Sequence, residues 1–270
     1  MGIIQRFSTQ FKEILHDSEL LLILAKRDIS VRYKQTYLGI SWAIVRPVLT
    51  MLVFLFAFKN VAKIQDLSGY PIQLVIFSGI LFWNLFSTTF QSVSNSILTN
   101  GNLISKVYFP RLIICLSSTA VSLVDFFVGL IVYLILTFAL GHSISIHIIF
   151  LPIALILTLL SSLGFGILFA SFSVKYRDLL QLIPLVVQYG FFVTPIVYTS
   201  QSLIDSKWFI YYSIINPLAG LVEFFRFGLI VDYRLFNINI LLISIGSTLF
   251  IFLLSLFVFH RREDSFVDHL

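Results

Sequence analysis

Residues 100–111, Asn-Gly-Asn-Leu-Ile-Ser-Lys-Val-Tyr-Phe-Pro-Arg, form a short polar stretch between two long apolar runs. Basic residues in short loops are typical of the cytoplasmic side of a membrane protein. The stretch carries two of them, Lys106 and Arg111. Placing it in the cytoplasm fixes the direction of every neighbouring apolar segment, so this loop decides the predicted topology.

The composition is that of an integral membrane protein. Hydrophobic residues make up 58% of the chain and charged residues only 11%, whereas soluble domains have about 25% charged residues. The long apolar runs lack the alternating pattern of an outer-membrane β-barrel. The net charge of +5 fits basic cytoplasmic loops and requires no nucleic acid partner. The sequence therefore predicts an all-α integral membrane protein.

Six apolar segments approach or exceed the roughly 20 residues that a helix needs to cross a bilayer. They run over about Leu38–Phe58, Pro71–Leu98, Leu112–Leu140, Ile146–Phe172, Leu179–Tyr198 and Phe236–Phe259. A seventh apolar stretch, 208–231, is interrupted by Asn216-Pro217. If this stretch also crossed the membrane, the C-terminal arginines would lie on the periplasmic side. That would break the charge rule, by which basic residues gather on the cytoplasmic side. We therefore predict six transmembrane helices, with 208–231 as a re-entrant helical hairpin buried in protein at the outer face.

The chain is expected to form one transmembrane domain over residues 1–270. Residues 1–35 form a cytoplasmic, interfacial segment, because the apolar residues between Gly2 and His16 share one face of an amphipathic helix. Residues 36–260 form the six-span core, and 261–270 form a polar cytoplasmic tail. Both termini are then cytoplasmic.

Charged and polar residues within the spans are candidate functional residues, because burying them in a bilayer is costly. Asp125 lies in the third span, and Arg46 in the first is its candidate partner; the alternative is that Asp125 is satisfied locally at a helix–helix contact. The polar residues between Ser87 and Asn95 indicate interhelical hydrogen bonds or a wet cavity. In the hairpin, Glu223 and Arg226 are spaced i, i+3 and are expected to pair.

Two further groups are candidates for ligand contact. A basic cluster before the first span satisfies the charge rule on its own, and it is also a candidate site for an anionic lipid or diphosphate headgroup. Its members are Lys26, Arg27, Arg32 and Lys34. Four aromatic residues share one face of the second span; core packing is the more common role for such residues, and contact with sugar rings is the alternative. They are Phe82, Trp83, Phe86 and Phe90.

The sequence offers no catalytic chemistry. It has no Gly-x-x-x-x-Gly-Lys-Ser/Thr loop for a nucleotide, no His-Glu-x-x-His pair for a metal and no Gly-x-Ser-x-Gly elbow for a nucleophile. Small residues at four-residue spacing in the fourth span, Ser162, Gly166 and Ala170, instead indicate close helix packing. We therefore expect no catalytic, cofactor-binding or metal-binding residues in this chain.

Four blocks of sequence resemble the permeases of polysaccharide ABC transporters, in the ABC-2 membrane superfamily. The blocks are Lys26–Pro47, Asn102–Arg111, Val174–Asp178 and Asn216–Arg226. They cover nearly the whole chain in the order found in that family. The resemblance is greatest to the branch that exports lipid-linked O-antigen for lipopolysaccharide, and the teichoic-acid, capsule and other glycolipid exporters are the nearest alternatives.

The resemblance implies a homodimer of six-helix subunits in the bacterial inner membrane, with two cytoplasmic ATPase subunits that hold ATP and Mg²⁺. A polysaccharide carried on undecaprenyl diphosphate would cross between the two permeases, and the N-terminal segment would lie along the surface of the membrane lipid. From their positions within the spans, we expect Arg46 and Asp125 to organise the helices at the dimer path. Residues 100–111 would form the coupling helix that docks into the ATPase, and the hairpin would narrow the periplasmic exit. The residues thus assigned to coupling are Asn100, Asn102, Lys106, Tyr108, Phe109, Pro110, Arg111, Lys175, Arg177 and Asp178, and those assigned to the exit are Asn216, Glu223 and Arg226.

An integral-membrane glycosyl- or acyltransferase acting on the same lipid carriers is the alternative from another functional class. Such an enzyme needs acidic or histidine residues that converge at a membrane face, and the sequence shows no such cluster. Export against a gradient needs energy, and the chain has no nucleotide-binding motif. A separate ATPase partner is therefore expected.

Overall fold

The computed structural model describes residues 17–34, 39–61, 66–67, 69–200, 208–263 and 266. Within these ranges the secondary structure is almost wholly helical, which confirms the predicted all-α class. In chain order the elements are α2 (Ser18–Lys34), a 3₁₀ turn η1 (Gly39–Ser41), α3 (Trp42–Phe56), a π-helical turn η2 (Ala57–Val61), β1 (Asp66–Leu67), β2 (Tyr70–Pro71), α4 (Ile72–Thr99), α5 (Gly101–Ile104), α6 (Leu112–Ser117), α7 (Ala120–Ala139), η3 (Ile146–Phe150), α8 (Leu151–Ser173), α9 (Leu179–Val193), α11 (Trp208–Ile215), α12 (Leu218–Leu229) and α13 (Ile238–Arg262).

Five helical segments in the described part of the chain are long and apolar enough to cross a bilayer. They are Gly39–Lys59, Ile72–Thr99, Leu112–Ala139, Ile146–Ser173 and Ile238–Arg262. Each corresponds to one of the predicted spans, and the boundaries agree within a few residues. The third of them is interrupted after α6, where the hydroxyl groups of Ser118 and Thr119 donate to carbonyl oxygens of the preceding turn.

The predicted fifth span is shorter than the sequence suggested. α9 has 15 residues, which at 1.5 Å per residue gives about 22 Å, against a hydrocarbon core of about 30 Å. It ends at Val193 because Pro195 disfavours helical geometry in the residue before it, and Thr194 is extended, with ψ of 142°. The prediction of a helix through Tyr198 was therefore wrong for its last five residues.

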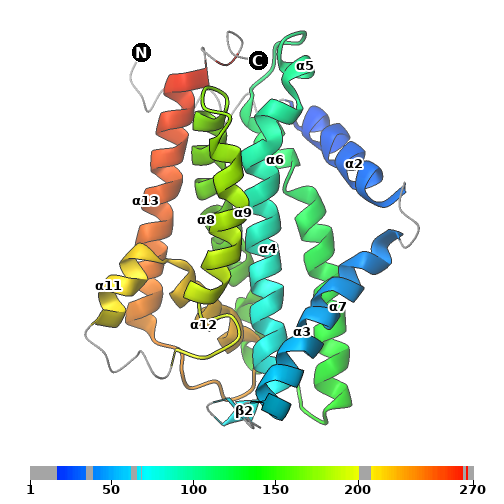
Figure 1. Ribbon diagram of the computed structural model, residues 1–270, viewed down its shortest axis with the longest axis vertical. Coiled ribbons are helices and arrows are strands. Elements are labelled where there is room, and N and C mark those ends of the chain that lie inside the picture. The colour runs from blue at the N-terminus through cyan, green and yellow to red at the C-terminus, as the bar shows by residue number, and fades with distance from the viewer. Residues whose placement is uncertain are drawn as a thin grey trace.

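α4 is the central helix of the bundle. It packs against α8, α7, α3, α12 and α9, and Figure 1 shows it between α8 and α13 on one side and α3 and α7 on the other. In the most apolar 18-residue part of α4, 83% of the residues are buried, whereas in the corresponding part of Gly39–Lys59 only 11% are buried. The strongly apolar α3 is therefore peripheral, and α4 carries the core.

Glycines in α8 allow its close packing on two neighbours. A Cβ added at Gly166 would lie 2.7 Å from the Val93 side chain of α4, and one added at Gly164 would lie 3.1 Å from the Phe252 backbone of α13. Ser162 and Ala170 are also fully buried. The predicted packing ridge on this helix is confirmed.

The stretch 208–231 forms two short helices, α11 and α12, separated at Asn216-Pro217 as predicted. α12 is almost entirely buried, whereas α11 exposes Ile210 and Ile215. Both lie in the half of the molecule opposite α5 (Figure 1). The break in the helix is confirmed, and its re-entrant position in a membrane stays a prediction.

α2 lies obliquely beside the bundle (Figure 1) and packs against α6 and α7. It exposes Leu22, Ile23 and Val31. The predicted amphipathic helix between Gly2 and His16 and most of the polar tail 261–270 lie outside the described residues.

Candidate functional site

The stretch 100–111 lies at one end of the bundle, between α4 and α6 (Figure 1). The predicted short helix is present as α5, but it covers only four residues, and the chain then continues in turns and bends. The Tyr108 side chain is 99% exposed and Lys106 is exposed, whereas Phe109 is buried in the apolar cluster formed with α6, α8 and α13. The loop therefore has an exposed tip next to an anchored aromatic residue.

Both ends of this loop are held by hydrogen bonds to distant elements. The Asn100 side-chain oxygen accepts a bond of 2.9 Å from Arg27 of α2. The Arg111 guanidinium donates to the carbonyl oxygen of Glu263 and lies 5.9 Å from the centre of the Phe266 ring. Asn100 and Arg111 thus position the loop against α2 and the end of α13, while Lys106 and Tyr108 face outward.

The second basic loop lies at the same end of the molecule, between α8 and α9 (Figure 1). Lys175, Arg177 and Asp178 are exposed. Arg177 and Asn102 line the same surface cavity of about 310 Å³. The two basic loops therefore lie close together, and their joint role in coupling stays a prediction.

The basic cluster of α2 divides into outward and inward residues. Lys26, Arg27 and Lys34 are exposed, and Arg27 pairs at 2.8 Å with the neighbouring Asp28. Arg32 is partly buried and turns toward the bundle. Only one of the four predicted headgroup residues therefore reaches the interior.

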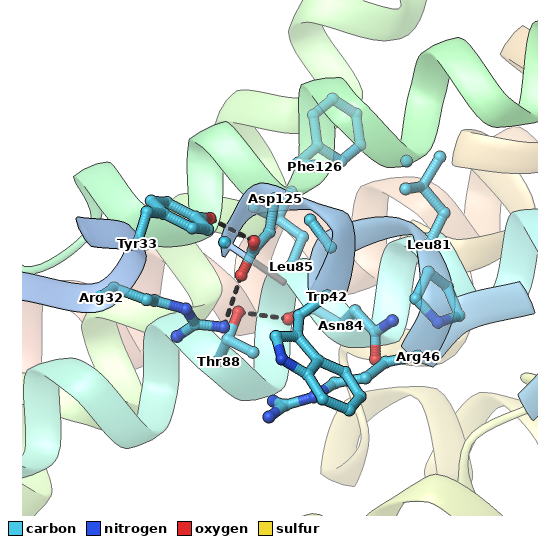
Figure 2. Close-up of a pocket in the computed structure, with 14 residues that line it drawn as sticks. Arg32, Tyr33, Trp42, Arg46, Leu81, Asn84, Leu85, Thr88, Asp125 and Phe126 are labelled. Atoms are coloured by element: carbon cyan, nitrogen blue, oxygen red, sulfur yellow. Dashed lines mark hydrogen bonds and ion pairs between the residues drawn. The ribbon is translucent and has the colours of Figure 1, made fainter. Parts of the chain in front are cut away.

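The carboxylate of Asp125 on α7 is bound by two consecutive residues of α2. It accepts a bond of 2.7 Å from the Arg32 guanidinium and a second from the Tyr33 hydroxyl (Figure 2). Burial, and next the bond to Asp125, raise the pKa of the Tyr33 hydroxyl above its usual range, so this group stays protonated as the donor. Asp125 therefore fastens the C-terminal end of α2 to α7.

The predicted ion pair between Arg46 and Asp125 is not formed. Arg46 instead lies over the Trp42 ring of its own helix, with 5.5 Å between the guanidinium carbon and the ring centre. Arg32 takes the place of Arg46 because the end of α2 packs against α7. Both arginines nevertheless line one cavity of about 390 Å³ between α2, α3, α4 and α7 (Figure 2).

A polar face of α4 extends from this cavity to the loop 100–111. Most of its side chains bond to carbonyl oxygens one turn earlier in the same helix, as Gln91 does to Ser87 and Asn95 to Gln91. One interhelical bond joins Thr89 to Ser122 of α7 at 2.6 Å. A second cavity, of about 410 Å³, lies along this face and is also lined by Arg27 and Arg32. Both predicted roles of the polar residues, interhelical bonding and a polar cavity, are thus present.

Glu223 and Arg226 of α12 form the predicted pair, with 3.4 Å between their charged atoms. Both are buried, and Arg226 has no exposed surface. Glu223 also accepts bonds from the backbone N–H and hydroxyl of Ser200 and from the hydroxyl of Tyr233. Buried charges are tolerated when they are paired and hydrogen-bonded. This pair meets both conditions except at Arg226 Nε, which has no hydrogen-bond partner among the described residues.

The pair fixes the extended segment that follows α9. Arg226 donates to the carbonyl oxygens of Ile196 at 2.6 Å and Tyr198 at 3.1 Å. A Cβ added at Gly79 of α4 would lie 1.9 Å from the Ile196 oxygen, so only glycine permits this approach. Asn216, the third residue assigned to the exit, accepts from the Leu218 N–H at the start of α12. Glu223 and Arg226 are therefore part of one buried, polar structural unit, and the half-buried Asn216 lies beside it at the start of α12.

The four aromatic residues of α4 lie in the core. The side chains of Phe82, Trp83, Phe86 and Phe90 are at most 5% exposed. Phe82 packs edge-on against Phe225 of α12, and Trp83, Phe86 and Phe90 pack against rings of α9 and α8. In the protomer they pack against other helices, and Trp83, Phe86 and Phe90 also line a cavity of about 440 Å³ between α4, α8, α9 and the start of α12. Their contact with sugar rings stays a prediction.

Sequence reasoning missed three participants in these sites. The hydroxyl groups of Tyr33, Ser200 and Tyr233 each donate a hydrogen bond to a carboxylate that lies ten or more residues away in the sequence. No local spacing marks such pairs. The chemistry available at these sites is polar and electrostatic: among the described residues, no group of three His, Cys, Asp or Glu side chains is arranged to hold a metal ion.

Comparison with known proteins agrees with a transport role. Residues 19–230 match the family described as "ABC-2 type transporter". The chain is similar to the O-antigen export system permease protein RfbA of Myxococcus xanthus, with 25% identity over 257 residues that cover 95% of this chain and 97% of that protein. It is also similar to two proteins of the same name from Klebsiella pneumoniae, at 29% and 30% identity over 210 residues, covering 77% of this chain and 79% of each relative.

The family match extends from the first turn of α2 to the end of α12. It includes both basic loops, the Asp125 site and the Glu223–Arg226 pair. Because the match covers most of the chain, the protein is a multi-pass membrane protein that belongs to the ABC-2 type transporter family.

Proposed function

We propose that the chain is the membrane permease of an ATP-driven exporter that moves a lipid-linked polysaccharide, such as O-antigen, from the cytoplasm to the periplasm. The family supports transport, and the printed names of the relatives support the class of substrate. The observation that carries the proposal is structural: two short basic loops converge at one end of the bundle, beside the exposed Tyr108. This is the surface to which a cytoplasmic motor would bind.

The proposed topology has six spans, formed by the five long helices and the shorter α9, in the bacterial inner membrane. The loops 100–111 and 175–178 and the basic last turn of α13 all lie at one end (Figure 1), as the charge rule requires of the cytoplasmic side. Both termini are then cytoplasmic. The α11–α12 hairpin would lie in the outer half, where its half-buried Asn216 and its buried Glu223 and Arg226 would bound the exit.

The ATPase is proposed to be a separate subunit that binds ATP and Mg²⁺ and contacts the tip of the loop 100–111. Lys106 and Tyr108 face outward, and the anchors at Asn100 and Arg111 hold both ends of the loop against α2 and α13. A force applied at the tip would therefore be transmitted to the helices through fixed contacts. Two ATPase subunits and two permeases are proposed, since each permease offers one such surface.

The polymer is proposed to pass between two copies of the chain. Between α4, α8, α9 and the start of α12, the described part of one protomer holds a cavity of about 440 Å³. This volume is far smaller than a polysaccharide, so a polymer would need a second copy of the chain to complete its path. α3 exposes a continuous apolar face that includes Leu49, Leu52, Val53 and Phe56. This face is suited to contact with lipid or with the second copy. The carrier would be undecaprenyl diphosphate, whose charge suits the exposed basic residues of α2.

The experiment is co-purification of the chain with its ATPase, followed by measurement of ATP hydrolysis. We expect Lys106→Ala combined with Tyr108→Ala to weaken the complex and return ATP hydrolysis to the level of the isolated ATPase. Lys59→Ala is the control, because Lys59 is an exposed cation in η2, the turn that follows α3, and is no part of this loop. Glycosyl or acyl transfer by the isolated chain, without an ATPase, would overturn the proposal.

A further inference from the structure

The cavity between α2, α3, α4 and α7 carries more positive than negative charge. Its charged lining residues are Arg32, Arg46 and Asp125. Asp125 is bound to Arg32 and Tyr33, and among the described residues no carboxylate pairs with Arg46. One guanidinium group is therefore neutralised in the cavity and the other is not.

The volume and lining of the cavity suit an anionic group on an apolar tail. Its volume of about 390 Å³ lies within the range of about 300–1,000 Å³ for ligand pockets. The half-buried amide of Asn84 adds a neutral donor beside the two guanidinium groups, while Leu81, Leu85 and Phe126 add an apolar wall. Trp42 and Ile44 on α3 continue that apolar surface outward.

We propose that this cavity binds the phosphate or diphosphate group of an amphiphilic lipid between Arg32 and Arg46, and that Asp125 holds Arg32 while the cavity is empty. Guanidinium groups match phosphate oxygens with two parallel hydrogen bonds, and two of them suit a diphosphate. The identification of the ligand rests on the proposed function, which supplies a lipid diphosphate. An anionic phospholipid headgroup shares the same chemistry.

Asp125 is the residue that distinguishes this proposal from a purely structural contact. A carboxylate repels an incoming phosphate and competes with it for Arg32, so the ligand must displace one end of the ion pair. Tyr33 keeps its bond to Asp125 when Arg32 leaves, because the hydroxyl does not depend on the guanidinium. Removing the charge of Asp125 should therefore strengthen anion binding, whereas a structural role predicts only a loss of stability.

The test measures binding of farnesyl diphosphate to the purified full chain in detergent, by titration calorimetry. We expect Arg46→Ala and Arg32→Ala each to weaken binding about tenfold, the loss typical of one charge-assisted hydrogen-bonding group. We expect Asp125→Asn to tighten it about threefold or more, by removing a like charge next to the ligand. Arg234→Ala is the control, since Arg234 is an exposed arginine outside this cavity.

Farnesol and short-chain phosphatidylglycerol separate the sources of the anion. Farnesol should not bind in a manner that depends on the arginines. If phosphatidylglycerol shows the same dependence on all three residues as farnesyl diphosphate, the site is confirmed and assigned to membrane phospholipid; if only the diphosphate does, it is assigned to the lipid carrier. Arg32→Lys replaces Arg32→Ala if the latter does not fold, and it should weaken binding because it keeps the charge but loses the paired donors.

Binding that is equal to wild type in Arg46→Ala, or that is weaker in Asp125→Asn, would overturn the inference. The co-purification experiment on the loop 100–111 is independent of this cavity. If the ATPase complex forms and hydrolyses ATP while the binding pattern fails, only the inference is wrong. If no ATPase associates while the binding pattern holds, the proposed function is wrong and the anion site remains.

Discussion

The buried Glu223–Arg226 pair gives the strongest test of the fold. Arg226→Met would replace the guanidinium by an apolar side chain and leave the Glu223 carboxylate buried without its cation. Removing one partner of a buried ion pair costs about 3–5 kcal/mol. Glu223 would keep its bonds from Ser200 and Tyr233, which lowers the cost, but the carbonyl oxygens of Ile196 and Tyr198 would each lose a donor. We therefore expect a loss within that range.

The assay is thermal unfolding of the purified protein in detergent. For a chain of this size 1 kcal/mol shifts the melting temperature by about 2–4 °C, so the expected decrease is about 6–20 °C. The double variant Glu223→Gln with Arg226→Met removes the uncompensated charge and should melt above the single variant. A melting temperature of Arg226→Met within about 2 °C of wild type would refute the reasoning, because it would mean that the pair is not buried or not formed.

Further predictions concern packing and the loop. Gly79→Ala should lower the melting temperature strongly or prevent folding, because the added Cβ would overlap the Ile196 oxygen. Gly246→Ala in α13 should melt at or above the temperature of wild type, because no atom lies within 4 Å of the added Cβ. Phe109→Ala should destabilise the protein by about 3–5 kcal/mol, the cost of a buried phenylalanine. Tyr108→Ala should leave the melting temperature unchanged and reduce only ATPase association, since its side chain is fully exposed; equal loss of stability in both variants would contradict this assignment.

The spans and the central break could be predicted because they depend on local sequence. The length of each apolar run sets the length of a helix, and Asn216-Pro217 interrupts the helix at the position where the chain breaks. The Glu223–Arg226 pair was also predictable, because residues at i and i+3 share one helical face. The early end of α9 could have been found too, since Pro195 constrains the residue before it.

Contacts between distant segments could not be predicted in the same way. Asp125 and Arg32 are 93 positions apart, and the apolar pattern of α2 does not show which helix it packs against. Arg46 was the nearer candidate only because it lies inside a predicted span. The aromatic face of α4 posed the same problem, since helical spacing shows that Phe82 and Phe86 lie near one another and does not show whether a cavity or other helices cover them.

Transport itself gives the most direct test of the central claim. The chain and its ATPase would be reconstituted in vesicles with the ATP sites outward and a labelled lipid-linked polysaccharide in the outer leaflet. We predict movement of the label to the interior that requires ATP hydrolysis and is lost in the combined Lys106→Ala and Tyr108→Ala variant. Movement at the same rate without ATP, or with the variant loop, would contradict the account.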